Sequence, residues 1–126
     1  MLVYIAGPLY TEKQRLFLEK VDQLCKDLRF ETFLPHRDAG LWDTEDHKIL
    51  FQKDKEALDK SQLVVAVLYE EDNGTAWEIG YAYAHKIPLV VLGDPNTADI
   101  MIKESSTFVI SLGDLKHELA QKAREG

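Results

Sequence analysis

Short apolar runs alternate with longer polar segments along the chain, which is typical of a protein that buries β-strands between helices. Turn residues or charged segments bound each run, and the fourth run contains Pro88 near its start, where a strand tolerates a missing N–H group. The runs therefore predict buried β-strands. They are residues 2–6, 30–34, 63–68, 87–92 and 107–110.

The polar segments between these strands carry apolar residues at helical spacing. Residues 11–28 hold one such stripe, which runs from Phe17 to Leu28 and predicts an amphipathic helix. Residues 36–43 contain Gly40 and several charges, and are predicted to form a loop. Further helices are expected at residues 45–60, 75–85, 98–103 and 112–124.

The alternation of strands and helices predicts an α/β fold, a three-layer sandwich with a five-stranded parallel sheet and right-handed crossovers. A length of 126 residues suits a single domain that spans residues 1–126. We expect the Rossmann-like strand order 2-1-3-4-5, in which the loops after strands one and three face each other across one crevice. Ligands of open α/β sheets bind in that crevice.

Composition excludes several classes of partner. The formal net charge of -7 argues against a nucleic acid or an anionic membrane surface, because both require a basic face. No apolar run approaches the roughly 20 residues that span a bilayer, and the residues after Met1 lack the basic start of a secretion signal. Cys25 is the sole cysteine, so no intramolecular disulfide forms. We therefore expect a cytoplasmic protein that binds a small molecule.

Neither a metal nor a cofactor is expected. The histidines show no ligand spacing with cysteine or with carboxylates, so the sequence predicts no metal site. Neither a Gly-rich dinucleotide motif nor a phosphate-binding P-loop is present in the sequence.

Carboxylates stand where the crevice is predicted. Glu78 follows the third strand, and Thr75 to Glu78 match a capping box, in which the glutamate only caps its helix. Alternatively, the first helical turn holds the Glu78 carboxylate ionised, as a nucleophile requires. Asp72 precedes Asn-Gly and is either a turn residue or an acceptor for a substrate hydroxyl.

Two further side chains are candidates for chemistry at the same crevice. Asp54 shares a helix face with apolar residues, so it is either an acid whose pKa is raised by burial or a surface residue paired with Lys53 or Lys55. Tyr4 is either a core aromatic or a hydroxyl that orients a carboxylate across the crevice. Gly7 lets a ligand approach the backbone closely.

Three segments carry a pattern that is known from one family. Residues 4–9 read Tyr-Ile-Ala-Gly-Pro-Leu, and Asp54 is followed by the run at residues 61–66. Residues 72–82 contain Gly-Thr-x-x-Glu-x-Gly-Tyr-Ala, the most specific part of the pattern. Together these segments resemble the nucleoside 2-deoxyribosyltransferase family, and the resemblance covers nearly the whole chain. It implies a flavodoxin-like fold and an enzyme that moves 2-deoxyribose between nucleobases without a cofactor.

The resemblance also implies roles for single residues. Glu78 matches the nucleophile that attacks C1′ of a 2′-deoxynucleoside and forms a covalent deoxyribosyl-enzyme, and Asp54 matches the position that handles the nucleobase proton. Asp72 matches the residue that holds the sugar, and Tyr4 the tyrosine that positions the nucleophile. Other positions in the matched motifs are expected to line the substrate site. They are Gly7, Pro8 and Gly74.

A second subunit is implied as well. Asp99 and Met101 fall where the family inserts residues from a neighbouring subunit, so the resemblance implies at least a homodimer. Some members of the family have an asparagine at the position of Asp99.

Three alternatives bear on this interpretation. A 2′-deoxynucleoside 5′-monophosphate N-hydrolase, from a branch of the same family, would need a first loop that holds phosphate. Here residues 7–13 contain one glycine, and Pro8 lacks an amide donor, so we favour a nucleoside. A non-catalytic nucleotide-binding module predicts that Glu78 only caps its helix. A phospho-acceptor domain needs acids after the first strand, where the sequence has Ala6, Gly7 and Pro8.

Overall fold

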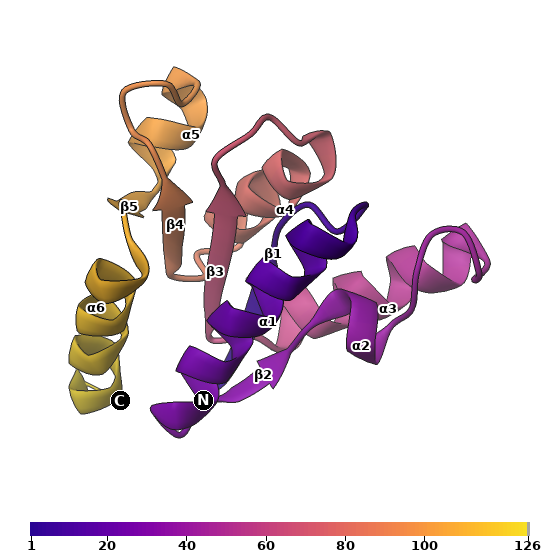
Figure 1. The fold of residues 1–126 in the computed structure, drawn as a ribbon, viewed down its shortest axis with the longest axis horizontal. Coiled ribbons are helices and arrows are strands. Elements are labelled where there is room, and N and C mark those ends of the chain that lie inside the picture. The colour runs from indigo at the N-terminus through magenta and orange to yellow at the C-terminus, as the bar shows by residue number, and fades with distance from the viewer. Residues whose placement is uncertain (126) are drawn as a thin grey trace.

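The computed structural model describes residues 1–125, which form one parallel sheet with helices on both faces (Figure 1). The sheet has five strands in the order β2-β1-β3-β4-β5, so the predicted order 2-1-3-4-5 is confirmed. The strands are β1 (Leu2–Ala6), β2 (Glu31–Phe33), β3 (Leu63–Leu68), β4 (Leu89–Gly93) and β5 (Thr107–Val109). The helices are α1 (Glu12–Asp27), α2 (Pro35–Asp38), α3 (His47–Lys60), α4 (Asn73–Ala84), α5 (Ile100–Ser105) and α6 (Leu112–Glu125).

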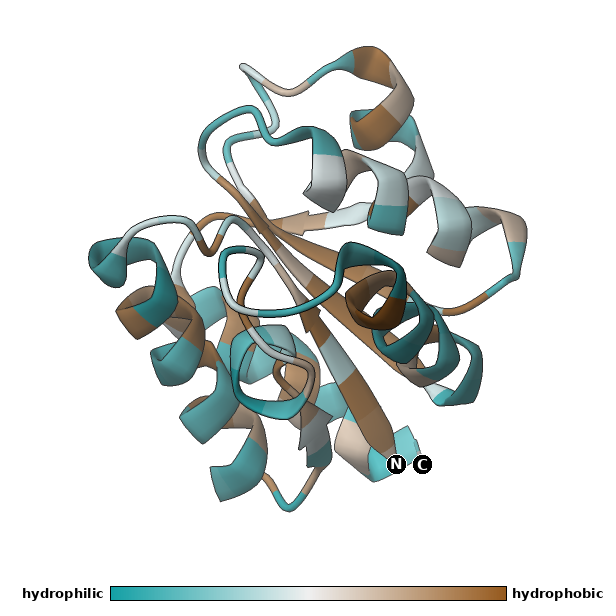
Figure 2. Cartoon of the chain, turned by 90° about the vertical axis from the view of Figure 1, so that its right-hand side faces the viewer, coloured by the Kyte–Doolittle hydropathy of each residue, from teal (hydrophilic) through white to brown (hydrophobic). Residues whose placement is uncertain are grey.

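Two apolar cores lie on opposite faces of the sheet. One packs β-strand side chains such as Val3 and Ile5 against α1 and α6, and the other packs side chains such as Tyr4 against α3 and α4. Successive strand residues point to opposite faces, which is why Tyr4 faces α3 and α4 while its neighbours face α1. Figure 2 shows the strands as the hydrophobic centre, with hydrophilic positions on the outer sides of the helices.

Helix caps account for most differences between the predicted and observed boundaries. Helix α4 begins at Asn73 rather than at Thr75, because the Asp72 side chain caps it and accepts a hydrogen bond from the Thr75 amide. The predicted loop 36–43 contains the short helix α2, which starts at Pro35, a residue suited to the first helical position. Strand β4 begins at Leu89, just after Pro88.

The pairing of β1 with β3 determines where the functional region lies. These strands pair in parallel, with Ala6 opposite Ala66, so the loops that follow them leave the same edge of the sheet. The first loop leads into α1 and the second into α4 (Figure 1). No helix among residues 1–125 is long and apolar enough to cross a membrane.

Candidate functional site

A cavity of about 510 Å³ opens at the carboxyl ends of β1 and β3. Its walls come from the loops after these strands, from α2 and the loop that follows it, from α3 and from the start of α4. Of the residues that the sequence singled out, this cavity brings together Glu78, Asp54, Asp72, Gly7 and Gly74. They come from three separate segments of the chain, the loop after β1, helix α3 and residues 72–78, so the fold alone makes these segments neighbours.

Glu78 is held by a hydrogen bond from the opposite side of the crevice. The Tyr4 hydroxyl donates to Glu78 Oε2, while the Tyr4 ring is fully buried and stacks on Phe33 with a centroid distance of 5.4 Å. Burial and the charges of Glu78 and Asp54 raise the pKa of Tyr4 well above its usual value, so the phenol keeps its proton. The buried ring therefore presents a fixed donor to one carboxylate oxygen, and Glu78 Oε1 accepts no hydrogen bond from any described residue.

The Glu78 carboxyl does not favour ionisation as the sequence led us to expect. Burial is the main cause that raises its pKa to about 8, with the charges of Asp54 and Asp72 adding to it, while the Tyr4 hydrogen bond opposes the rise. Because α4 begins at Asn73, Glu78 lies in the second helical turn, beyond the strongest field of the helix N-terminus. The expected capping box is also wrong, since Asp72 provides the cap.

Asp54 lies on the half-buried face of α3, and its Oδ1 atom is buried without a hydrogen-bond partner. Burial raises the pKa of Asp54 to about 6. The expected alternative, a surface pair with Lys53 or Lys55, is wrong, because Lys55 pairs with Asp59 at 3.1 Å and no ion pair of Asp54 occurs within the described chain. A half-buried, unpaired carboxyl of raised pKa suits a group that gives and takes a proton.

Asp72 is both a helix cap and a wall of the cavity. Its Oδ2 atom accepts hydrogen bonds from the Thr75 amide, at 3.0 Å, and from the Thr75 hydroxyl. Its Oδ1 atom accepts none among residues 1–125 and remains an acceptor for a ligand hydroxyl. The two interpretations of Asp72 are therefore compatible, because separate oxygens serve them.

Aromatic side chains form much of the remaining cavity wall. Tyr10 and Trp42 lie with ring centroids 6.1 Å apart, and Phe51 meets Trp77 edge-on at 5.5 Å. The sequence analysis did not assign Phe51 or Trp77 to the site. Phe51 lies one turn before Asp54 and Trp77 lies just before Glu78, and these positions were the signal that could have identified both.

Gly7 contributes its backbone to the cavity, but the reason for a glycine at this position is close packing against neighbouring side chains. A Cβ atom there would lie 2.5 Å from Leu18 Cδ2 and 3.3 Å from Val67 Cβ. A side chain at position 7 would therefore force the buried Leu18 side chain to move. Gly74 differs, because a Cβ atom there would meet only Asp72 Oδ2, at 3.9 Å.

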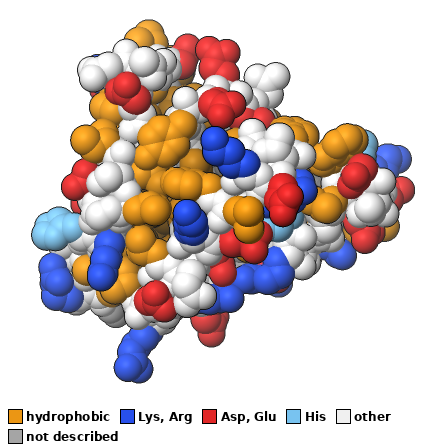
Figure 3. All heavy atoms as spheres, in the orientation of Figure 1, with side chains coloured by type: hydrophobic (Ala, Val, Ile, Leu, Met, Phe, Trp, Pro, Cys, Tyr) orange, Lys and Arg blue, Asp and Glu red, His pale blue; other side chains and the backbone are white. Residues whose placement is uncertain are grey.

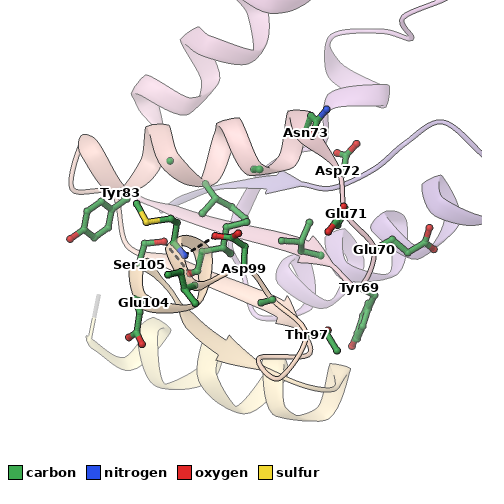
Figure 4. A pocket seen from close by; sticks show the side chains of 18 residues that line it. Tyr69, Glu70, Glu71, Asp72, Asn73, Tyr83, Thr97, Asp99, Glu104 and Ser105 are labelled. Carbon is green, nitrogen blue, oxygen red and sulfur yellow. Dashed lines mark hydrogen bonds between the residues drawn. The ribbon is translucent and has the colours of Figure 1, made fainter.

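Three of the expected site residues lie elsewhere. Pro8 lines a separate cavity of about 1100 Å³ against α1, on a face where hydrophobic side chains gather along the middle of the molecule (Figure 3). Asp99 and Met101 line a third cavity, of about 890 Å³, between α4 and α5, and Met101 is 75% exposed. Figure 4 shows Asp72 and Asn73 at one end of this third cavity and Tyr83 at the other.

The site holds no metal cluster. No group of three or more histidine, cysteine or carboxylate side chains within residues 1–125 could hold a metal ion. What the cavity offers is one carboxyl positioned by a phenol, a second carboxyl that is free to exchange a proton, and aromatic walls. Such a set suits cleavage of a glycosidic bond, where one carboxylate stabilises C1′ and the other group protonates the departing atom.

Solved structures share this fold. A 2-deoxyribosyltransferase from Bacillus psychrosaccharolyticus is 22% identical, with a TM-score of 0.81 and coverage of 92% of this chain and 90% of that chain. A conserved protein from Enterococcus faecalis V583 is 26% identical, with a TM-score of 0.77 and coverage of 97% and 98%. A CMP N-glycosidase from Clostridium botulinum is 16% identical, with a TM-score of 0.70 and coverage of 96% and 99%.

The sequence itself gives the family. A comparison with curated proteins finds no significant match. The family described as nucleoside 2-deoxyribosyltransferase matches residues 3–112, a span that includes β1, α3, β3 and α4 and hence every wall of the cavity around Glu78. The chain belongs to the nucleoside 2-deoxyribosyltransferase family.

Proposed function

We propose that the protein cleaves the N-glycosidic bond of a 2′-deoxynucleoside and transfers the sugar to a second nucleobase through a covalent intermediate on Glu78. The observation that carries this proposal is the pair of carboxyls in one cavity, with Tyr4 holding one oxygen of Glu78 and Asp54 unpaired beside it. Two carboxyls with separate roles are the usual apparatus of a retaining glycosidic enzyme.

The first step forms the intermediate. Glu78 Oε1, which accepts no hydrogen bond from the described residues, attacks C1′ as the bond from C1′ to the base nitrogen breaks. The electron pair of that bond goes to the nucleobase, which takes the proton of Asp54 and leaves as a neutral base. The products are a deoxyribosyl ester of Glu78 and an ionised Asp54.

The second step reverses the first with another base. A ring nitrogen of the incoming nucleobase attacks C1′, and the ester bond breaks with its electron pair returning to the Glu78 carboxylate. Asp54 takes the proton that the incoming nitrogen loses, which restores the starting form of the protein. If water replaces the second base, the ester is hydrolysed and no transfer occurs. The aromatic wall favours transfer because it stacks on a base and excludes water. This wall is formed by Tyr10, Trp42, Phe51 and Trp77.

The two raised pKa values let the pair hold one proton between them. Burial raises the pKa of Glu78 to about 8 and that of Asp54 to about 6, so near pH 7 the two carboxyls together carry one proton. Attack requires that proton on Asp54 and an ionised Glu78. A nucleobase next to Asp54 supports this arrangement because it withdraws water from that carboxyl and gives its proton a hydrogen-bond acceptor.

Asp72 is the proposed sugar-binding residue. Its Oδ1 atom faces no donor among the described side chains, and Oδ2 is fixed by Thr75, so the carboxylate is already oriented for a sugar hydroxyl. Gly74 lies beside it without a side chain that could obstruct the sugar.

We further propose a homodimer or larger homo-oligomer in which α5 of one subunit reaches the cavity of its neighbour. Asp99 caps α5 by accepting a hydrogen bond from the Met101 amide at 2.9 Å, and Ile100 and Met101 are 72% and 75% exposed. Neither Asp99 nor Met101 lines the cavity around Glu78 in their own chain. Exposed apolar residues at this position are available to a partner surface.

A 5′-monophosphate N-hydrolase is the second candidate, and one observation favours it. The Asn73 and Gly74 amides are at the start of α4, line the cavity and donate no hydrogen bond within the described chain, which is a feature of anion sites. The Asp72 carboxylate at the same helix end opposes an anion there. A non-catalytic module required Glu78 to serve only as a cap, and that role belongs to Asp72.

Incubation with deoxyinosine, with and without adenine, tests the proposal. Chromatography should detect deoxyadenosine only when adenine is present, and mass spectrometry of the quenched protein should detect one deoxyribosyl unit on the peptide that contains Glu78. A parallel incubation with a deoxynucleoside 5′-monophosphate should release little base. Base release from the monophosphate without exchange would favour the hydrolase, and no reaction with any base would refute both candidates.

A further inference from the structure

The family pattern at residues 72–82 contains a tyrosine that the proposed reaction does not use, Tyr81. It lies on α4, three residues after Glu78, and its hydroxyl donates a hydrogen bond to Asp59 Oδ1 on α3. Glu78 and Asp54 come from these same two helices. The bond therefore joins the two elements that carry the carboxyls of the candidate site.

Asp59 binds a second partner on its own helix. Its Oδ2 atom lies 3.1 Å from Lys55 Nζ, so Tyr81 and Lys55 each occupy one oxygen of the carboxylate. Lys55 Nζ also lies over the Tyr81 ring, 5.8 Å from its centroid. The hydrogen bond from Tyr81 is the main cause that lowers the pKa of Asp59, so this acceptor stays ionised. A hydrogen bond to an ionised acceptor is stronger than one between neutral groups.

Stacking holds the Tyr81 ring in place. The Trp77 ring lies one turn before it with a centroid distance of 5.2 Å, and the His85 ring lies one turn after it at 3.9 Å. Both rings are nearly parallel to that of Tyr81, with interplanar angles of 18°. Residues four apart are neighbours on a helix surface, so this stack belongs to α4 itself. The hydroxyl therefore reaches α3 from a ring that is held on both faces.

A second contact links the same two helices. Phe51 of α3 meets Trp77 of α4 edge-on, with a centroid distance of 5.5 Å. Along α3, Asp54 lies between Phe51 and Asp59. Glu78 has the corresponding place on α4, between the residues that make the two contacts. The two carboxyls thus lie between an aromatic contact and a polar contact of their helices.

The spacing of α3 and α4 matters because both carboxyls must act on one bond of the substrate. The Asp54 charge adds to the effect of burial on the pKa of Glu78, and both influences weaken if the helices separate. The carboxylates also repel each other whenever both are ionised. A contact that resists this repulsion has to lie outside the reacting pair, as the bond from Tyr81 to Asp59 does.

We infer that Tyr81 is a positioning residue, whose hydroxyl holds α4 against α3 through Asp59 and thereby sets the position of Glu78 relative to Asp54. This inference rests on the proposed function, since these are the two carboxyls of the proposed reaction. Tyr81 does not line the cavity, so it acts through the helices and not by contact with the substrate.

The first test compares kcat and KM for base exchange between wild type and Tyr81→Phe, which keeps the stacked ring and removes the hydroxyl. Displacing a reacting group by about 1 Å costs up to about 100-fold in rate. Because the aromatic contact between the helices remains, kcat should fall by about 10-fold. KM should stay within about 3-fold, since Tyr81 lies outside the cavity.

A carboxyl titration provides a readout that does not depend on turnover. In Tyr81→Phe, water gains access to Glu78 and the helices move apart, so the upper apparent pKa of the pair should fall from about 8 by about 0.5 or more. Nuclear magnetic resonance of ¹³C-labelled carboxyl groups measures this value, and the alkaline limb of the pH profile should move with it. Other titratable groups also act on Glu78 and stay in place in the variant. They are Tyr4 from β1 and Asp72 before α4.

Asp59→Ala removes the acceptor of the same hydrogen bond and serves in place of Tyr81→Phe if that variant fails to fold. It should reproduce both effects, and the double variant should lose no more than either single variant. Tyr83→Phe is the matched control, because Tyr83 is an exposed tyrosine of the same helix whose hydroxyl bonds to no residue among 1–125. It should behave as wild type. Unchanged kcat and titration in Tyr81→Phe, or losses that add in the double variant, would overturn the inference.

The two readouts separate this inference from the proposed function. If wild type exchanges no base, but the upper pKa falls in both Tyr81→Phe and Asp59→Ala, the inference stands and the proposed chemistry is refuted. If wild type exchanges bases and neither variant changes kcat or the titration, the proposed function stands and the inference is overturned.

Discussion

Two groups of carboxylates in this protein differ in how their charges are compensated. Between α1 and α2, Asp22 lies 3.2 Å from Lys26 Nζ and 3.0 Å from Arg37 Nη1, and Arg37 also contacts Asp38 at 2.7 Å. The hydrogen bond from Arg37 is the main cause that lowers the pKa of Asp38. Every carboxylate of this network has a cation within contact distance, as buried charges in proteins usually do.

The candidate site has no such compensation. Asp54 and Glu78 lie together without a cation of their own, and burial raises the pKa of both. The partner that Glu78 does have is the neutral Tyr4 hydroxyl. The carboxylates of the first group are paired with cations, whereas the two in the cavity are not and have raised pKa values. Ionisable groups with shifted pKa values in a cavity are a usual sign of a functional site.

The largest expected effect is loss of catalysis in Glu78→Gln. The amide keeps the shape of the side chain and accepts the Tyr4 hydrogen bond, but it cannot attack C1′. Base exchange should fall by about 1000-fold or more, since the covalent route is closed. Far-ultraviolet circular dichroism should match wild type, and Asp22→Asn, the counterpart in the paired network, should retain exchange activity. Exchange by Glu78→Gln near the wild-type rate would refute the assigned nucleophile.

Asp54→Asn should have the next largest effect and should change the pH profile. The productive form carries one proton between Glu78 and Asp54, so wild-type kcat/KM should be bell-shaped, with limbs near pH 6 and pH 8. Above the upper limb both groups are ionised and no acid remains, and below the lower limb both are protonated and no nucleophile remains. Activity should be highest near pH 7.

In Asp54→Asn only Glu78 still titrates. The alkaline limb should therefore disappear, and the single remaining acid limb should follow the pKa of Glu78 alone, which lies below about 8 because the Asp54 charge no longer raises it. The rate should fall by about 100-fold to 10,000-fold, the usual contribution of a general acid. A bell-shaped profile in the variant would show that another group donates the proton.

The contrast also explains what the sequence could and could not predict. The parallel sheet followed from the alternation of apolar strands with amphipathic helices, and the strand order with its crevice followed from the usual arrangement of such five-stranded sheets. Asp54 stood out because a carboxylate on an apolar helix face is costly. The start of α4 was misjudged because Thr75 and Asp72 both suit an N-cap, and only the folded geometry decides between them.

Long-range contacts explain the remaining errors. The raised pKa of Glu78 depends mainly on burial, and also on the charges of Asp54 from α3 and of Asp72, so no local pattern reports it. The hydrogen bond between Gln14 and the Thr11 amide is local by contrast, since Thr11-x-x-Gln14 is a capping-box pattern that the sequence analysis did not use. Asp99 and Met101 lie away from the cavity in their own chain, and their use by a neighbouring subunit stays a prediction.

Asp22→Asn should destabilise the fold, in contrast to changes in the cavity. Asp22 is 5% exposed and is bound by Lys26 and Arg37, so the variant loses two charged contacts at a buried position. The free energy of unfolding should fall by about 2–3 kcal/mol. Urea denaturation measures this loss, with Glu118→Gln as the control. Glu118 forms an i,i+4 pair with Lys122 at 3.8 Å, so that variant should lose only about 0.5 kcal/mol.

The smallest expected effect has the opposite sign and belongs to Glu78→Gln. Because the folded-state pKa of Glu78, about 8, exceeds its ordinary value of 4.5, the native state holds this proton more tightly than the unfolded chain. Wild type therefore loses stability as the pH rises from about 4.5 through about 8, whereas the glutamine variant does not.

Near pH 5 the two proteins should unfold at similar urea concentrations. At pH 8 the variant should be more stable by about 1–2 kcal/mol, or about 3–6 °C in Tm. A variant less stable than wild type at pH 8 would mean that the Glu78 carboxylate stabilises the fold, as Asp22 does, and that the contrast between the two groups fails.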